Sequence, residues 1–196
     1  MNTGRTLPGD WYPGTIPDNV RIDDTAYVET SFSFTQYRSE EPIGVQIGKG
    51  SSTYSGTMFD VGRRGRVLLG DYVLVHGAKI RCDAELRIED YTLISWNVIV
   101  MDTYRAPFDP QKRRPLVERI PFHKQRRFEE ETIALPIRIG RAVWIGFDVC
   151  ILPEMTIGDG AIVSARSVVV DDVEPYTIVG GNPTRLMRRL DVKGID

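Results

Sequence analysis

The sequence is poor in the residues and runs that define several common classes of protein. Its 196 residues include two cysteines and two histidines. It has no stretch of about 18 apolar residues that could span a bilayer. Two cysteines are too few for a disulfide scaffold, and two histidines cannot form a three-histidine zinc site. We therefore expect no metal cofactor, no metal-dependent hydration chemistry and no membrane partner.

Neither sign of charge dominates, because 25 Lys and Arg stand against 27 Asp and Glu, for a formal net charge of -2. This balance argues against a general nucleic-acid partner or a membrane-surface protein. The first ten residues have no apolar signal core, so we expect a cytoplasmic protein. Cys82 and Cys150 lie in apolar, strand-like runs and are expected to be buried free thiols.

A six-residue repeat is what the sequence does contain. Six consecutive hexads begin with Ile or Val, at Ile139, Ile145, Ile151, Ile157, Val163 and Val169, and Pro175 begins a seventh. Small or apolar residues stand four positions further on, at Val143, Val149, Met155, Ala161, Ser167, Val173 and Val179. Neither strand alternation nor the helical period of 3.6 produces this spacing. Each hexad is too short for a helix and predicts one short strand and a turn.

The same period occurs earlier in the chain in other phases. Its leading residues there are Ile16, Ile22, Val28, Phe34, Ile47, Thr53, Phe59, Leu69, Val75, Ile88, Ile94 and Val100. Each change of phase indicates an insertion or bulge, near residues 35–46, 60–68, 76–87 and 101–138. The pattern predicts a prism of stacked coils with the leading side chains inside, because each coil buries its apolar side only against the next.

Three segments resemble a known family. Residues 139–146 (IGRAVWIG), 151–160 (ILPEMTIGDG) and 178–186 (IVGGNPTRL) are similar to the hexapeptide-repeat acyltransferases, the group of galactoside, maltose and xenobiotic acetyltransferases. The resemblance implies an all-β, left-handed parallel β-helix. We expect a single domain with an arm at 1–15, the β-helix at 16–182 with a basic loop insertion at 101–138, and a short C-terminal α-helix at 183–190. Pro183 at the start of that helix and arginines in its later turn suit it.

The resemblance also implies a function. Members are homotrimers that bind acetyl-CoA between adjacent subunits and transfer its acetyl group to a hydroxyl, with a loop histidine as general base. We therefore expect a CoA-dependent O-acetyltransferase for a small hydroxylated acceptor, a saccharide being one candidate. Ala106, before Pro107, stands where the family histidine is expected. Its presence leaves open the alternative of a catalytically degenerate trimeric β-helix protein that serves as a binding module or scaffold.

Three residues are candidates for the missing acid–base role. His76 precedes Ala106 by 30 residues, near the place where related enzymes carry an acceptor-binding asparagine that faces the base across a subunit boundary. It is either a replacement base or a histidine bonded on the prism face. His123 is either a second candidate base or a solvated residue of the insertion. Asp102 is either a catalytic residue that orients a base or binds acceptor hydroxyls, or a cap on a loop turn.

The cofactor-binding residues implied by the resemblance are Trp144, Ser164, Ala165, Arg166, Arg185 and Arg188. Trp144 matches the family pattern, whereas Arg166 replaces a glycine whose backbone lies against the pantetheine arm. That arginine would crowd the arm or offer a cation to phosphate. Asp171 stands where a lysine is frequent. Arg185 and Arg188 could bind phosphate through their guanidinium groups or form a solvated helix face.

The basic insertion concentrates positive charge. Residues 111–127 hold seven Lys and Arg against one Glu, a local charge of +7 − 1 = +6. A loop of this length in a compact solenoid is usually functional or disordered. One alternative is an anion clamp, in which these residues bind either the CoA phosphates or an anionic acceptor. The other is a solvated charged segment.

Overall fold

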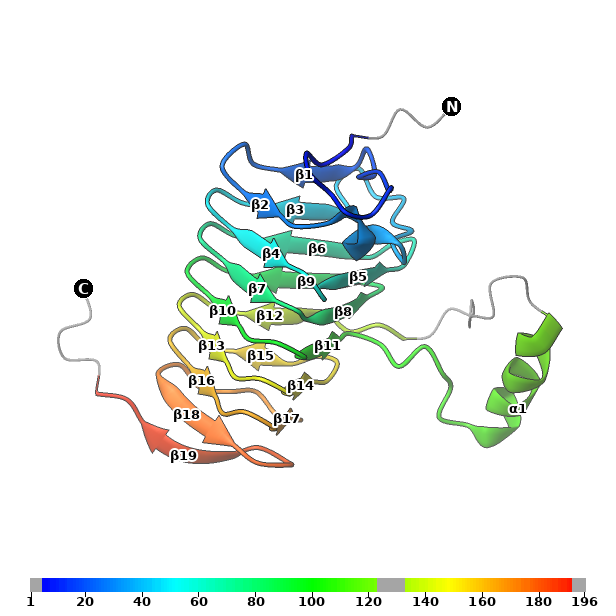
Figure 1. Cartoon of the computed structure of the whole chain (residues 1–196). Helices are drawn as coiled ribbons and strands as arrows, with labels where there is room; N and C mark the ends of the chain where they lie inside the picture. The colour runs from blue at the N-terminus through cyan, green and yellow to red at the C-terminus, as the bar shows by residue number, and fades with distance from the viewer. Residues whose placement is uncertain (1–4, 123–132, 192–196) are drawn as a thin grey trace.

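Successive coils of the chain contribute short strands to three sheets, which together form the sides of a prism (Figure 1). The computed structural model describes residues 5–122 and 133–191. The first sheet contains β1 (Val20–Ile22), β3 (Val45–Ile47), β6 (Arg66–Leu69), β9 (Glu85–Ile88), β12 (Ile137–Ile139) and β15 (Thr156–Ile157).

The second sheet contains β2 (Tyr27–Val28), β4 (Ser52–Tyr54), β7 (Leu74–His76), β10 (Leu93–Ile94), β13 (Trp144–Ile145), β16 (Ile162–Val163), β18 (Thr177–Gly180) and β19 (Arg185–Arg189). The third sheet contains β5 (Met58–Val61), β8 (Lys79–Cys82), β11 (Ile99–Met101), β14 (Cys150–Ile151) and β17 (Val168–Val169). All pairings are parallel except β18 with β19.

The predicted hexad positions form the core. All six Ile and Val that lead the hexads from Ile139 to Val169 are buried. Among the earlier leading residues, Ile22 is only partly buried. Pro175 is exposed. Ile157 pairs with Ile139, eighteen residues earlier, and with Val173, sixteen residues later. The last coil is therefore two residues shorter than the one before it.

The predicted C-terminal helix at 183–190 is wrong. Residues 185–189 form β19, which turns back at Gly181 and runs antiparallel to β18. The last parallel strand of a solenoid leaves a row of unpaired N–H and C=O groups at the sheet edge. Pairing with β19 satisfies these groups, which a helix could not do, so the need to close the edge outweighs local helix propensity.

The insertion at 101–138 was expected to be a loop, but it also contains helical structure. It contains α1 (Pro110–Arg119) and the 3-10 turn η2 (Ile120–Phe122), and Figure 1 shows α1 projecting away from the prism. Asp109 supplies the helix start, since its carboxylate accepts a hydrogen bond from the backbone N–H of Gln111 at 2.8 Å. A second 3-10 turn, η1 (Ser31–Phe34), lies in the first coil, between β2 and β3.

The outward sides of the three sheets differ in polarity. In the first sheet, a column of paired outward residues contains Arg21, Gln46, Leu68, Arg87, Arg138 and Thr156. In the second sheet, the matching column is Tyr27, Ser52, Leu74, Leu93, Trp144, Ile162 and Ile178. The corresponding column of the third sheet is Met58, Lys79, Ile99, Cys150 and Val168. The outward side of the second sheet is therefore rich in apolar side chains, whereas on the third sheet only the part formed by Ile99, Cys150 and Val168 is apolar. Both cysteines are free, but only Cys82 is fully buried.

Candidate functional site

Asp102 begins the loop that leaves β11, where the resemblance places the catalytic base. Its side chain is buried, and the backbone N–H of Asp83 donates to both carboxylate oxygens at 2.9 Å. The N–H of Ala84 donates to Oδ2 at 2.7 Å. Burial raises the pKa of Asp102, against the effect of these hydrogen bonds. The geometry favours the turn-capping alternative, and a catalytic role for Asp102 stays a prediction.

Arg105 is a residue of this loop that sequence reasoning missed. Its Nε and Nη2 donate to the two carboxylate oxygens of Asp83 at 2.8 and 2.6 Å, and Nη1 donates to Asp60 at 2.6 Å. Burial lowers the pKa of Arg105, but the bonds to Asp83 and Asp60 outweigh it and raise the pKa above its usual range. No sequence pattern signals this cluster, because its carboxylates lie 22 and 45 residues away.

Ala106 is half-buried next to this ion-pair cluster. The rings of Tyr104 and Phe108 meet edge to face, with centroids 5.5 Å apart, and both rings are exposed. The loop thus turns its arginine inward to the prism and its aromatic side chains outward.

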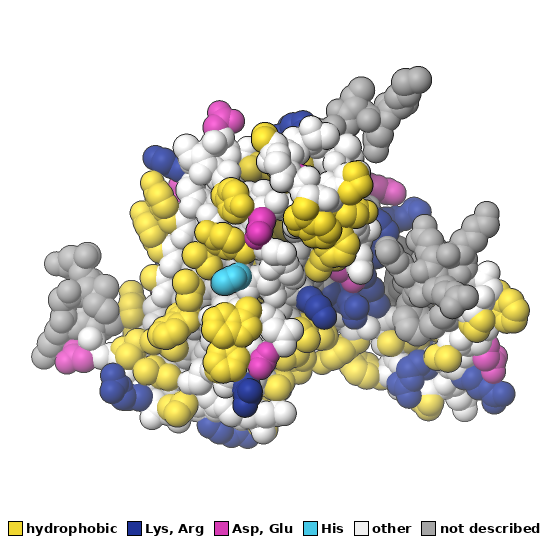
Figure 2. Space-filling view, viewed as in Figure 1, with side chains coloured by type: hydrophobic (Ala, Val, Ile, Leu, Met, Phe, Trp, Pro, Cys, Tyr) yellow, Lys and Arg dark blue, Asp and Glu magenta, His cyan; other side chains and the backbone are white. Residues whose placement is uncertain are grey.

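His76 lies at the end of β7 in a stack of side chains that we call the aromatic ladder. Its members, one on each successive coil, are Tyr27, Tyr54, His76, Trp96, Phe147 and Arg166. The His76 ring centroid is 5.3 Å from that of Tyr54 and 6.3 Å from that of Trp96. Figure 2 shows hydrophobic side chains around the histidine in view.

The imidazole of His76 is exposed, and neither nitrogen hydrogen-bonds to another residue in the part of the chain that the structure describes. A general base needs a nitrogen that the acceptor hydroxyl can approach. The second alternative, a histidine bonded to a neighbouring coil, has ring packing but no hydrogen bond in its support. His123 lies outside the described residues.

His76 and Ala106 lie near the two different corners of the prism that flank the third sheet. His76 precedes the third sheet, whereas the loop carrying Ala106 leaves that sheet beyond Met101, which pairs with Arg81 of β8. The four residues of β8 lie between these corners. They span about 13 Å at roughly 3.3 Å per residue.

The predicted groove residues lie on β13 and at the corner after β16. Trp144 is 51% exposed on the outward side of the second sheet. Gly146 permits close contact between coils, since a Cβ there would lie 2.6 Å from the backbone nitrogen of Ala165. The Ser164 hydroxyl lies 3.6 Å from the Met187 sulfur on β19.

Arg166 turns the corner with a left-handed backbone, φ 60°. Its guanidinium lies 5.7 Å from the Phe147 ring centroid and 3.5 Å from the Asp148 carboxylate. The side chain remains largely exposed. A cation is therefore available at this corner, although the residue also enlarges the aromatic ladder.

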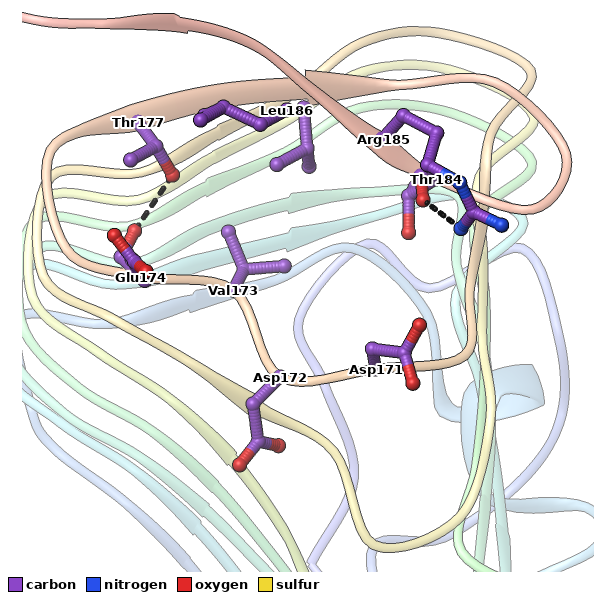
Figure 3. A pocket seen from close by; sticks show the side chains of 9 residues that line it. Asp171, Asp172, Val173, Glu174, Thr177, Thr184, Arg185 and Leu186 are labelled. Carbon is purple, nitrogen blue, oxygen red and sulfur yellow. Dashed lines mark hydrogen bonds between the residues drawn. The ribbon is translucent and has the colours of Figure 1, made fainter.

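A small cavity of about 220 Å³ lies at the C-terminal end of the prism, beneath the β18–β19 hairpin (Figure 3). Asp171, Asp172 and Glu174 line it together with Arg185. With three carboxylates and one guanidinium, the lining of this cavity has a net negative charge, which disfavours phosphate binding. Arg185 donates to the backbone carbonyl of Thr184 at 2.8 Å, and Arg188 is exposed on β19. The expected phosphate role of these arginines stays a prediction.

Helix α1 carries part of the basic insertion. Arg114 pairs with Glu118 at 2.8 Å, and Arg113 donates to the carbonyls of Pro107 and Phe108, both at 3.2 Å. Arg113 therefore connects the basic helix to the loop that holds Ala106. Lys112 and Arg119 also lie on α1, whereas Lys124, Arg126 and Arg127 fall outside the described residues.

Among residues 5–122 and 133–191, no group of three or more His, Cys, Asp or Glu is arranged to hold a metal ion. No helix in these ranges is long and apolar enough to cross a bilayer.

The three-sided prism of short parallel strands defines a class, the parallel β-helix proteins built from hexapeptide repeats. A hexapeptide-repeat acetyltransferase of Vibrio cholerae O1 biovar eltor, solved in complex with acetyl coenzyme A, superposes with a TM-score of 0.59 and 28% identity. The match covers 76% of this chain and 72% of that one. A galactoside acetyltransferase in complex with coenzyme A gives a TM-score of 0.55 at 22% identity, over 89% of this chain and 66% of the other.

The curated relatives match a shorter region. A chloramphenicol acetyltransferase of Agrobacterium fabrum (strain C58) is 53% identical over 51 residues, which is 26% of this chain and 24% of that protein. The match thus spans about a quarter of the relative's length. No family model matches the chain. The resemblance to hexapeptide-repeat acetyltransferases is confirmed, and the fold is their left-handed parallel β-helix.

Proposed function

We propose that the chain is a CoA-dependent O-acetyltransferase that acts on a small hydroxylated acceptor, a saccharide being one candidate, in the cytoplasm. The observation that carries the proposal is the similarity, over about three quarters of both chains, to a structure crystallised with acetyl-CoA. The 53% identity of a shorter segment to a chloramphenicol acetyltransferase supports it. The balanced charge argues against nucleic-acid or membrane partners.

We propose that the active form is a homotrimer. A cyclic trimer uses two different surfaces of each subunit and leaves the rest outside. The apolar column of the second sheet, and Ile99, Cys150 and Val168 on the third, suit such contacts, since large exposed apolar patches mark interaction sites. The charged column of the first sheet, with Arg21, Arg87 and Arg138, suits the solvent side.

The trimer matters for chemistry because it could bring two corners together. In this proposal, His76 of one subunit faces the Ala106 loop of the next and accepts the proton of the acceptor hydroxyl. The acceptor oxygen attacks the acetyl carbonyl, the carbon–sulfur bond breaks, and the proton returns to the leaving thiolate. The Asp102 carboxylate holds the first residues of the loop in place through its hydrogen bonds with Asp83 and Ala84.

The CoA site in this proposal runs along Trp144, Ser164, Ala165 and Arg166, with Arg185 and Arg188 toward the phosphates. Guanidinium groups are suitable donors for phosphate. The exposed cation at Arg166 fits this role, whereas the carboxylates near Arg185 oppose it.

The test is a titration with acetyl-CoA followed by a transfer assay. Saturable binding by calorimetry, together with free-thiol release that depends on a hydroxyl acceptor, supports the enzyme. Saccharides, amino sugars and antibiotics with free hydroxyls form a suitable acceptor panel. Failure to bind acetyl-CoA at millimolar concentration would contradict the proposal.

The second candidate is a catalytically degenerate trimeric β-helix protein that acts as a binding module or scaffold. Ala106 favours it, because alanine cannot accept a proton and loss of a general base costs about 10²–10⁴ in rate. A stable trimer without acetyl-CoA turnover over the full acceptor panel would support this second candidate.

A further inference from the structure

Two contacts hold the loop after β11 to the same short segment of the preceding coil. At the base of the loop, the Asp102 carboxylate accepts the backbone N–H groups of Asp83 and Ala84. Three residues later, Arg105 binds the Asp83 carboxylate through two hydrogen bonds. The segment between the two contacts is therefore fixed at both ends.

The Arg105 guanidinium also reaches a second coil. Nη1 donates to the Asp60 carboxylate at 2.6 Å, and Nη2 donates to its backbone carbonyl at 3.0 Å. Asp60 has two further arginines nearby, Arg81 at 3.3 Å and Arg38 at 3.6 Å. Within the described residues, Arg105 is the cation that contacts Asp83. Its planar fork suits two carboxylates at once, which an ammonium group cannot match.

The backbone bends sharply at Arg105. Its φ is 49°, in the left-handed region that L residues other than Asn, Asp and Gly rarely adopt. The Thr103 hydroxyl accepts the N–H of Arg105 at 3.1 Å, and Thr103 is fully buried. The bend at Arg105 turns the chain so that Tyr104 and Phe108 face outward on either side of Ala106.

We propose that Arg105 is a positioning residue that, through Asp83 and Asp60, fixes the loop bearing Tyr104 and Ala106 at the acceptor end of the site. The proposal rests on the proposed acetyltransferase function for its kinetic consequence only. Arg105 itself touches no substrate, because its side chain is 11% exposed and its guanidinium is bonded to carboxylates.

The test compares Arg105→Asn and Arg105→Lys with wild type. Asparagine tolerates the left-handed backbone, so Arg105→Asn removes the guanidinium without forcing a new bend. Arg138→Asn is the matched control, since it breaks an arginine–carboxylate contact to Glu89 at 3.4 Å on the first sheet. Hydrogen–deuterium exchange of residues 102–108 reports loop order directly, and kcat and KM for acetyl-CoA report the consequence.

We expect faster exchange of 102–108 by about tenfold in Arg105→Asn, an intermediate effect in Arg105→Lys, and no change in Arg138→Asn. Misplacement of a reacting group by about 1 Å can cost 10²-fold, so kcat should fall by about 10–100-fold. KM for acetyl-CoA should remain within about twofold, because the loop acts on the acceptor side.

Wild-type exchange at 102–108 in Arg105→Asn would overturn the proposal. So would an active Arg105→Asn protein with a loosened loop and unchanged kcat. If Arg105→Asn does not fold, hydrogen–deuterium exchange of residues 102–108 in Arg105→Lys and Asp60→Asn tests the proposal instead. The exchange measurement needs no catalytic activity, so absence of acetyl transfer in the wild type would refute the proposed function without refuting the positioning role of Arg105.

Discussion

The carboxylate of Asp10 binds Ser31, accepting its backbone N–H at 2.7 Å and its hydroxyl at 2.5 Å. This contact joins the N-terminal arm to the first coil. It places Trp11 against Phe32, with ring centroids 5.6 Å apart. The arm thereby covers the end of the prism, as capping segments of solenoids do.

We predict that acid releases this arm. Partial burial raises the pKa of Asp10, but hydrogen bonds from Ser31 and Tyr12 outweigh it and lower the pKa below the ordinary value. The stabilisation is complete above the unfolded value of about 3.9 and is lost as pH falls toward the lower native value. Trp11 fluorescence, measured against a Trp11→Phe protein, should change below about pH 4.

The matched variants for this prediction are Asp10→Asn and Asp24→Asn. Asp10→Asn should release the arm already at pH 7, whereas Asp24→Asn should behave as wild type because Asp24 is exposed. Identical acid transitions in Asp10→Asn and wild type would refute a role for the Asp10 charge.

We predict that Trp144→Glu disrupts the oligomer. The substitution places a charge in the apolar column of the second sheet, which an interface cannot bury without a large desolvation cost. Sedimentation should show a 22.2 kDa monomer for this variant and a trimer for wild type. Arg87→Glu on the first sheet is the control and should stay trimeric. A wild-type monomer at micromolar concentration would contradict the trimer.

We predict that His76→Ala lowers kcat by about 10²-fold or more, because it removes the proposed general base. The trimer and the fold should persist, since His76 is exposed. Tyr54→Ala serves as a control, because it removes the neighbouring ladder ring and leaves the imidazole. Full activity in His76→Ala would end the replacement-base hypothesis.

We predict that Ala106→His raises acetyl transfer. The loop register already places this residue before Pro107, where the related enzymes carry their base. A combined Ala106→His and His76→Ala protein should keep that activity, since the new imidazole replaces the old one. No transfer from Ala106→His, despite acetyl-CoA binding, would favour the scaffold alternative.

We predict that reversing charge at Arg113 and Arg114 weakens binding of CoA or an anionic acceptor and flattens its salt dependence. Exposed charges act over about 8–10 Å in physiological salt. Isothermal titration at several ionic strengths measures both effects. The control is the double variant Arg21→Glu and Arg87→Glu, which changes the net charge by the same amount on the first sheet. Equal affinities and salt slopes in the two double variants would exclude the anion clamp.

The sequence predicted the core because its information is periodic. Ile145, Ile151 and Ile157 are six residues apart and all point inward, since every coil repeats the contacts of the one before it. The C-terminal strand was mispredicted for the opposite reason. Residues 185–189 have no periodic signal, and their pairing depends on an edge created by the rest of the solenoid.

The sequence by itself determined the coil, its inward positions and the absence of histidine at Ala106, because these follow from local residue order. Only the tertiary structure decided that Arg105 binds Asp83 and Asp60, that β19 closes the sheet edge, and that His76 joins a ladder of rings. Each of these depends on groups from different coils. Stacking brings such groups together at distances that sequence separation does not encode, and buried charges or open edges then select the partners.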